Sequence, residues 1–342
     1  MARLLMIVSS ARSIDLATEK GHTTGYWADE VLKPYDKFVA AGVEVVVATP
    51  DGASPHVDPV GLEPRFHYPD EDKDFLWQVI RSFAPDIDDI RVTLHHYTEL
   101  DLIAARQVFN ALVDSGLDRD TAWSVVSLGA RYVWRDNRSF IDALSADSVV
   151  MSKMSLEHLR ALAYEVHDES AARAKHVAER LSSIETLRHP RNLSQMSDEE
   201  ILSFDAVFFP GGHGPMVDLA ANADVARVLR LLHLQQKTVA AVCHGPAAFL
   251  SAGSGPEGAW FFDGYKLAGF TDEEEDQTPY GKLGIAWYLE SELKNCGAVF
   301  DDGDAAWVSH VVVDRNLVTG QNPDSSEATA EAILKKLGVE VK

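Results

Sequence analysis

The sequence predicts an α/β doubly wound fold, in which helices flank a mostly parallel sheet, together with a helical insertion. Two observations carry this prediction. Short runs rich in β-branched residues are apolar at almost every position, as strands are when helices cover both faces of a parallel sheet. Helical stretches separate these runs, whereas the chain between residues 66 and 190 has helical patterns and no comparable strand signal.

Each predicted strand is a short apolar run that ends in turn residues. The runs lie at 4–10, 43–52, 205–214, 237–245 and 309–323. A helix is predicted over 26–42, because its pattern leads from the first run to the second and stops at Gly42. Pro34 predicts either a kink in that helix or a helix proper that begins nearby. The amphipathic stretch 325–338 predicts a closing helix.

The middle of the chain is predicted to be a separate helical segment. Its helical patterns lie at 98–116 and 155–183. The sequence "SDEE" (197–200) is a capping box that restarts the sheet-forming part of the chain. We therefore predict one α/β domain made of residues 1–66 and 188–342, and a helical insertion at 67–187 that serves as a lid or an oligomer interface.

Charge and cysteine content restrict the partners and the compartment. The chain has 53 acidic and 31 basic residues, a formal net charge of −22, which disfavours nucleic acid and anionic membranes as partners. No apolar segment approaches the ~20 residues of a membrane span, and the opening "MARLLMIVSS" reads as a core strand rather than a signal peptide. Cys243 and Cys296 alone cannot form a disulfide framework. We therefore expect a cytoplasmic protein.

Cys243 follows an apolar run in "AVCHGPAAFL" (240–249). Ala241 and Gly245 flank it in the small-x-nucleophile-x-Gly pattern of a nucleophile elbow, where small neighbours leave room for a strained turn. A thiol at the start of a helix is expected to have a lowered pKa, which favours the thiolate. The alternatives are a buried structural cysteine and a redox-sensing thiol. Cys296 lacks such a setting and is interpreted as structural.

A second turn, "PGGHG" (210–214), also follows an apolar run. Its consecutive glycines allow backbone N–H groups to approach a ligand oxygen closely, as an oxyanion hole requires. The alternative is an ordinary strand-to-helix turn. Within the predicted insertion, His96 and Glu99 could share a helical face, but two ligands without a third are weak evidence for a metal, and we predict none.

The stretches "FFPGGHGPMVDL" and "VCHGPAAFL" resemble the ThiJ/PfpI family, within the class I glutamine amidotransferase-like superfamily. Three further stretches resemble its branch of heat-shock chaperones and glutathione-independent glyoxalases (glyoxalase III): "TGYWADEVLKPYDKF" (24–38), "AGFTDEEED" (268–276) and "VVVDRNLVTGQNPDSSEATAEAIL" (311–334). The resemblance covers roughly residues 3–65 and 186–340 and implies a flavodoxin-like sheet. The helical insertion departs from the family and leaves the substrate open.

The resemblance also implies roles for individual residues. It makes Cys243 the nucleophile, His244 its neighbour in a catalytic pair, and Glu30 the acid/base beside the thiol. An acidic third residue near the histidine is expected to be Glu273 or Glu274, with a solvated acidic loop as the alternative. Taken without the resemblance, Glu30 would be interpreted as a solvated helix residue.

The remaining expected site residues bind the substrate or its oxyanion. They are Gly211, Gly212, His213 and Tyr26, with the backbone N–H groups of Gly212 and His244 as the oxyanion donors. Trp27 is interpreted as a packing residue that could also line the pocket.

The family-implied reaction is the conversion of methylglyoxal to lactate. It needs a small carbonyl substrate and no cofactor, which agrees with the lack of a phosphate-binding loop or a complete dinucleotide fingerprint. A homodimer or a higher homo-oligomer is expected. Two alternatives stay open: a cysteine-dependent hydratase or hydrolase acting on an isocyanide or an amide, and a holdase chaperone that would need an exposed apolar patch but not Cys243.

Overall fold

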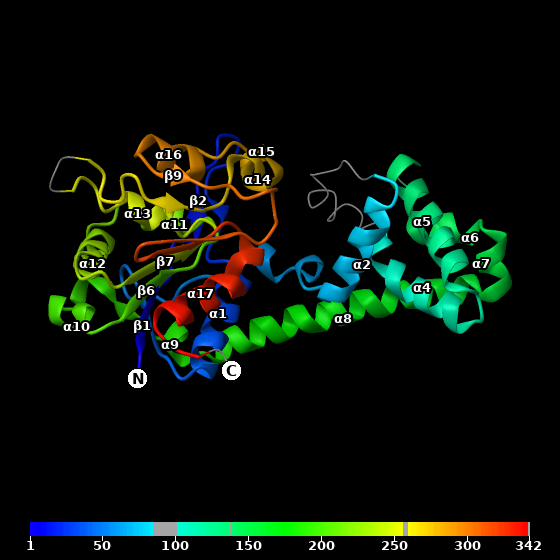
Figure 1. The fold of residues 1–342 in the computed structure, drawn as a ribbon, viewed down its shortest axis with the longest axis horizontal. Coiled ribbons are helices and arrows are strands. Elements are labelled where there is room, and N and C mark those ends of the chain that lie inside the picture. Colours follow the sequence, from blue (N-terminus) through cyan, green and yellow to red (C-terminus); the bar gives the residue numbers. More distant parts are fainter. Residues whose placement is uncertain (85–100, 137, 256–258, 341–342) are drawn as a thin grey trace. The chain divides into compact units, whose positions relative to one another are not determined.

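The computed structural model describes residues 1–84, 101–136, 138–255 and 259–340 (Figure 1). It divides into two compact units, Met1–Leu62 with Val177–Lys342, and Glu63–His176. Residues 177–187, which the sequence analysis assigned to the insertion, belong to the larger unit, because Leu181, Ile184 and Leu187 are buried in its core. His96 and Glu99 lie outside the described residues.

The larger unit is built on a seven-stranded sheet with the order β10-β11-β7-β6-β1-β4-β5. Its strands are β1 (Arg3–Ile7), β4 (Glu44–Thr49), β5 (Arg191–Asn192), β6 (Ala206–Phe209), β7 (Thr238–Val242), β10 (Val311–Asp314) and β11 (Leu317–Gly320). Every pair is parallel except β10 with β11. The order β4-β1-β6-β7-β11 is the 2-1-3-4-5 order of a flavodoxin-like sheet, so the predicted fold class is confirmed.

The central strands are buried over their whole length. All four residues of β6 and all five of β7 are buried, which explains their uninterrupted apolar sequence. The run at 309–323, predicted as one strand, is instead the antiparallel pair β10 and β11, joined by a turn in which Arg315 has a positive φ of 52°. Two small pairs accompany the sheet: β2 (Ser13–Ile14) with β3 (His22–Thr23), and β8 (Lys266–Leu267) with β9 (Val299–Phe300).

Helices flank the sheet of the larger unit (Figure 1). They are α1 (Ala28–Ala40), α9 (Glu185–Arg188), α10 (Asp198–Leu202), α11 (Pro215–Asp218), α12 (Ala223–Leu234), α13 (Ala247–Leu250), α14 (Asp272–Gln277), α15 (Pro279–Lys282), α16 (Leu289–Asn295) and α17 (Ser326–Lys336). α1 packs against α17, and α12 packs against α10. Ser197 caps α10 by accepting a hydrogen bond from the Glu200 N–H, as the capping-box sequence predicted.

The smaller unit is helical and has its own hydrophobic core. Its helices are α2 (Asp70–Arg81), α4 (Ala105–Asp114), α5 (Arg119–Asp136), α6 (Phe140–Ser145), α7 (Ser148–Lys153) and the first part of α8 (Leu156–Ser183). Gly129 allows α5 to approach α6 closely, since a Cβ there would lie 2.8 Å from a Leu144 methyl carbon. Phe140 and Leu144 fill the space beside it and are buried.

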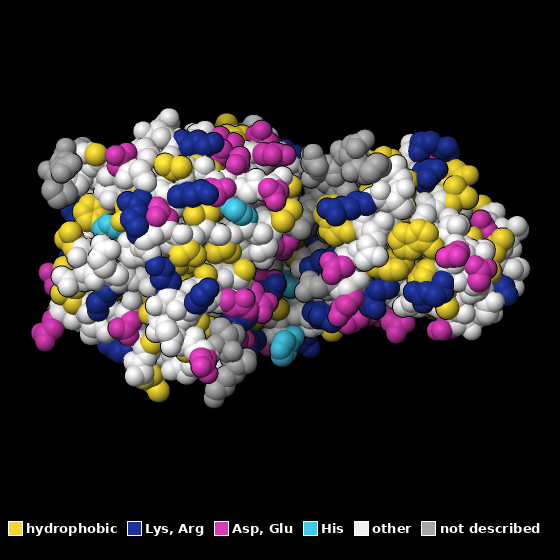
Figure 2. All heavy atoms as spheres, viewed as in Figure 1, with side chains coloured by type: hydrophobic (Ala, Val, Ile, Leu, Met, Phe, Trp, Pro, Cys, Tyr) yellow, Lys and Arg dark blue, Asp and Glu magenta, His cyan; other side chains and the backbone are white. Residues whose placement is uncertain are grey.

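Charged side chains of both signs are interspersed on the visible face of each unit (Figure 2). Among the described helices, none has both the length and the apolar character needed to cross a membrane.

Candidate active site

Cys243 directly follows β7 and has a backbone φ of +57°, which is strained for a residue with a side chain. Gly245 makes this turn possible, because a Cβ at that position would lie 2.0 Å from the Phe209 carbonyl oxygen at the end of β6. The small-residue pattern thus allows β6 and the turn after β7 to approach each other. This geometry matches the predicted nucleophile elbow.

The glycine turn after β6 lies against the elbow. A Cβ on Gly211 would lie 2.6 Å from the His244 backbone nitrogen, and a Cβ on Gly212 would lie 2.5 Å from the Gly25 carbonyl oxygen. Gly212 also has a positive φ of 78°. The Gly212 N–H donates a hydrogen bond to the Cys243 sulfur. This bond lowers the pKa of the thiol, whereas burial and Glu30 raise it. The glycines therefore bring backbone donors close to the sulfur.

Glu30 reaches the sulfur from the first turn of α1 and is fully buried. Its Oε2 accepts a hydrogen bond of 2.7 Å from the Gly211 N–H. Burial raises the pKa of Glu30 to about 8, although hydrogen bonds with the Cys243 thiol and with Gly211 act in the opposite direction. The second oxygen, Oε1, has no other polar partner among the described residues. At neutral pH this carboxyl is therefore mostly protonated.

The thiol of Cys243 is 3% exposed. Burial raises its pKa well above the ordinary value, and the neighbouring Glu30 raises it further. The sequence analysis expected the start of a helix to lower this pKa. That expectation is wrong for the free protein, because α13 is only four residues long and the thiol is enclosed beside a carboxyl.

On its other side the thiol faces His244. The Cys243 sulfur lies 3.3 Å from His244 Nδ1, and His244 Nε2 lies 2.7 Å from Glu275 Oε2. Since a carboxylate accepts hydrogen bonds, the proton of the neutral imidazole is assigned to Nε2, which leaves Nδ1 as the acceptor facing the thiol. Burial, together with the nearby His213, lowers the pKa of His244 to about 4, so the ring is neutral.

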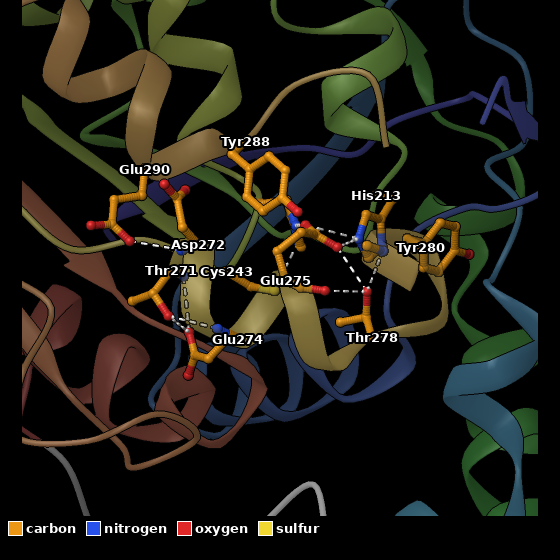
Figure 3. A network of polar contacts seen from close by, with 12 residues as sticks. His213, Cys243, Thr271, Asp272, Glu274, Glu275, Thr278, Tyr280, Tyr288 and Glu290 are labelled. Carbon is orange, nitrogen blue, oxygen red and sulfur yellow. Dashed lines mark hydrogen bonds and ion pairs between the residues drawn. The ribbon is translucent and has the colours of Figure 1, made fainter. Parts of the chain in front are cut away.

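The acidic partner of His244 is Glu275, which corrects the expected Glu273 or Glu274. Glu273 is exposed. Glu274 points away from the histidines, toward Thr271 (Figure 3), whose hydroxyl caps α14 in a reciprocal capping box. Glu274 also accepts hydrogen bonds from the Trp307 N–H and the Asn322 side chain.

Consecutive residues of a short helix point about 100° apart, so three adjacent glutamates cannot share one partner. The capping-box pattern "TDEE" is a sequence signal that assigns Glu274 to the helix start. This signal, which the sequence analysis did not use here, would have removed Glu274 from the candidates.

Glu275 is held by three side chains. His213 Nε2 lies 2.9 Å from its Oε1, the Thr278 hydroxyl donates to the same oxygen at 2.8 Å, and His244 contacts Oε2. Burial alone would raise the pKa of Glu275, but the two histidines outweigh it and lower this pKa below its usual range. Glu275 is therefore an ionised, buried carboxylate.

Neighbouring side chains hold the His213 ring in place. Its ring stacks on Tyr280 with centroids 3.7 Å apart, and the Tyr280 hydroxyl donates to buried Asp58 at 2.5 Å. The sequence analysis did not single out Thr278, Tyr280 or Asp58, since no local pattern marks them. His213 was expected to bind the substrate or the oxyanion. In the structure its Nε2 lies instead within hydrogen-bond distance of the Glu275 carboxylate.

Tyr26 is buried at the start of α1, and burial raises the pKa of its hydroxyl. Its backbone N–H donates to the His56 carbonyl, and the next N–H, that of Trp27, donates to the Gly211 carbonyl at 3.2 Å. The hydrogen bond between Trp27 and Gly211 therefore ties this segment to the glycine turn. A role for Tyr26 in lining a pocket stays a prediction.

Residues 194–336, which include the elbow, the glycine turn and Glu275, match the model of the DJ-1/PfpI family. The matched segment lies within the larger unit. This match confirms the predicted resemblance to the ThiJ/PfpI family. Glu30 lies before the matched segment, so its assignment rests on the structure and on the resemblance of residues 24–38.

Known proteins similar to this chain include the protein/nucleic acid deglycase HchA of Escherichia coli. It is 32% identical over 158 residues, which are 44% of this chain and 53% of HchA. The chain thus spans about half the length of the curated relatives it matches.

Two solved structures share the fold at 18% identity and a TM-score of 0.56. One is the Rapid Encystment Protein of 24 kDa from Francisella tularensis, with 98% of this chain and 99% of that chain covered. The other is glyoxalase III from Candida albicans, with 100% of this chain and 98% of that chain covered. At this identity the two structures support the fold class alone.

Proposed function

We propose that the protein is a cysteine-dependent enzyme that acts on small reactive carbonyls and converts methylglyoxal to lactate without glutathione. One observation carries the proposal: the buried Cys243 thiol lies between two acid–base systems, Glu30 on one side and the His244–Glu275 pair on the other. The similarity to a relative named a deglycase supports a reaction of this general type.

The first step is attack of sulfur on the aldehyde carbon. The Cys243 proton passes to His244 Nδ1, a C–S bond forms, and the carbonyl electron pair moves onto oxygen. Ionised Glu275 stabilises the resulting imidazolium through Nε2, as the acid of a catalytic triad does. The N–H groups of Gly212 and His244 are the nearby donors for the oxyanion, which takes up the proton from His244 to give a hemithioacetal.

The second step moves hydrogen between the two carbonyl carbons. Glu30, in its ionised form, removes the proton from the carbon that carries sulfur, which gives an enediolate. The same carboxyl then returns a proton to the neighbouring carbon, the hydroxyl proton of the sulfur-bearing carbon passes to the neighbouring oxygen, and the product is a lactoyl thioester on Cys243. A pKa of about 8 suits this task, because the carboxyl both accepts and donates a proton close to neutral pH.

The last step is hydrolysis of the thioester. Water adds to the thioester carbon, the C–S bond breaks, and the sulfur recovers its proton. The sum is methylglyoxal plus water giving lactic acid, with no net oxidation or reduction and no cofactor. Glu30 and His244 are the groups that can move the protons of the attacking water and the departing thiol.

The burial of Cys243 bears on substrate size. With 3% of the residue exposed, the sulfur is more accessible to a free three-carbon carbonyl than to an adduct attached to a protein or nucleic acid. We therefore favour free methylglyoxal over a macromolecular deglycase substrate.

The test compares wild type, Cys243→Ala and a matched control, Cys296→Ala, for lactate formation from methylglyoxal without glutathione. Cys296 is the other cysteine and lies, half-buried, at the C-terminal end of α16. We expect turnover in wild type and Cys296→Ala and a loss of at least about 10³-fold in Cys243→Ala. A wild type that forms no lactate would refute the substrate. Turnover that survives in Cys243→Ala would refute the mechanism.

A suppression-of-aggregation assay with the same variants addresses the holdase alternative, because a holdase should not depend on Cys243. Assays of the same variants with isocyanide and amide substrates test the hydratase and hydrolase alternatives in parallel.

A further inference from the structure

One carboxylate in the site is shared by two imidazoles. His213 Nε2 and His244 Nε2 both contact Glu275, at 2.9 and 2.7 Å, and the three side chains are buried. Their potential ligand atoms all lie within 4.8 Å of one another. Figure 3 shows Glu275 pointing toward His213 from α14. In the proposed reaction His213 only helps to keep Glu275 ionised and moves no proton itself.

We propose that His213, His244 and Glu275 form an inhibitory binding site for a divalent transition-metal ion such as Zn²⁺. The ligands are the Nε2 atoms of both histidines and the carboxylate of Glu275, and water fills the remaining position. Two imidazole nitrogens and a carboxylate suit zinc and related ions and do not suit Mg²⁺ or Ca²⁺, which prefer oxygen ligands.

The geometry requires little rearrangement. Ligand bonds to zinc of about 2.0–2.2 Å in a tetrahedron place neighbouring ligand atoms roughly 3.3 Å apart. The two N···O distances of 2.9 and 2.7 Å would therefore widen by roughly half an ångström. Tyr280 stacks on His213, and the Thr278 hydroxyl donates to Glu275, so the ligands are already oriented by their neighbours.

Metal binding would change the state of the nucleophile. Each imidazole must present an unprotonated Nε2, so its proton moves to Nδ1. In His244 that Nδ1–H then faces the Cys243 sulfur, now 3.3 Å away, and donates to it. His244 can then no longer accept the thiol proton, because its Nδ1 already carries a proton.

One effect on the proposed reaction follows from this change. The metal should lower lactate formation, because the proton transfers through His244 are blocked.

The binding experiment titrates Zn²⁺ into chelator-treated full-length protein by calorimetry. We compare wild type, His213→Gln, Cys243→Ser and a control, His189→Gln, which removes an exposed histidine that also pairs with a glutamate. We expect one site per chain, an affinity reduced at least about 100-fold in His213→Gln, and less than about tenfold changes in the other two variants. Equal affinity of wild type and His213→Gln, or no site in wild type, would overturn the proposal.

A spectrum of wild type loaded with Co²⁺ serves as a measurement that needs no variant to fold. Tetrahedral ligation by nitrogen and oxygen gives visible d–d bands without the near-ultraviolet band of a cobalt–thiolate bond. A strong thiolate band would overturn the ligand set. These binding readouts do not depend on the reaction proposed above.

The functional arm measures lactate formation with and without Zn²⁺, followed by a chelator. We expect turnover to fall at least about tenfold with the metal and to recover with the chelator. Turnover that rises or stays unchanged when the site is saturated would overturn the inhibitory mechanism even if the ion binds.

Discussion

Glu30 and Glu275 lie on opposite sides of the Cys243–His244 pair and are equally buried, yet the protein holds them in opposite protonation states. Glu30, from α1, accepts one backbone N–H, and burial raises its pKa to about 8. Glu275, from α14, contacts two histidines and a threonine hydroxyl, and its pKa is lowered. The difference teaches that burial alone does not decide ionisation in this site; the number and kind of donors do.

The largest expected effect is on catalysis at Glu30. Glu30→Gln keeps an oxygen for the Gly211 N–H but cannot take a proton from carbon. We expect kcat for lactate formation to fall on the order of 10³-fold or more. Asp29→Asn, at a neighbouring position in the first turn of α1, is the matched control and should change kcat by less than about threefold. A Glu30→Gln enzyme with near-normal kcat would show that the two carboxyls do not differ in role.

A smaller loss is expected at Glu275. In Glu275→Gln the amide N–H can donate to His244 Nε2, which would move the histidine proton to Nδ1 and remove the acceptor that faces the thiol. We expect kcat/KM to fall roughly 10²–10³-fold, with the fold and the burial of Cys243 retained. Steady-state kinetics and a near-ultraviolet circular dichroism spectrum check both points. Normal kcat/KM would mean that His244 does not act through Glu275.

The two carboxyls should also affect stability with opposite dependence on pH. The raised pKa of Glu30 means that the folded protein keeps a proton which the unfolded chain loses above pH 4.5. Wild type should therefore lose stability relative to Glu30→Gln as pH rises from 4.5 to about 8, by on the order of 4 kcal/mol at about 1.36 kcal/mol per pKa unit. Urea unfolding of both proteins at pH 5 and pH 8 measures this difference, and a constant difference would contradict the raised pKa.

For Glu275 the sign is reversed. Its pKa is lower in the folded state, so its stabilising contribution is present above pH 4.5 and is lost as pH falls below that value. The stability deficit of Glu275→Gln should therefore shrink between pH 5 and pH 3.5.

The smallest effects are expected at the other two glutamates of α14. Glu274→Gln puts an amide N–H where the Trp307 and Asn322 donors now point, and should cost about 1–3 kcal/mol of unfolding free energy. Glu273→Gln changes an exposed side chain and should stay within about 0.5 kcal/mol, with unchanged turnover. Thermal unfolding and lactate assays measure both. A loss of turnover in Glu273→Gln as large as in Glu275→Gln would contradict the assignment of Glu275.

The local patterns of the sequence predicted much of the fold and part of the site. Apolar runs identified the buried strands β1, β4, β6 and β7, because a strand covered on both faces needs apolar side chains throughout. Small residues identified the elbow and the glycine turn, because only they fit where two backbone segments nearly touch. Glu30 came from the resemblance of its surroundings to a family, since by itself it is one acidic residue in a helix.

Only the tertiary structure decided which acid pairs with His244, how Cys243 is ionised and where the helical unit ends. Glu275 pairs with His244 because its side chain points toward the histidine from the short helix α14. The sequence places three glutamates next to one another and does not show which of them points that way. The thiol pKa depends on enclosure and on Glu30, which is more than 200 positions away in the chain but adjacent in space. The sequence by itself determined the elements and the turns because those depend on neighbouring residues. Partners and protonation states depend on distances across the fold, so they were settled only when the elements packed together.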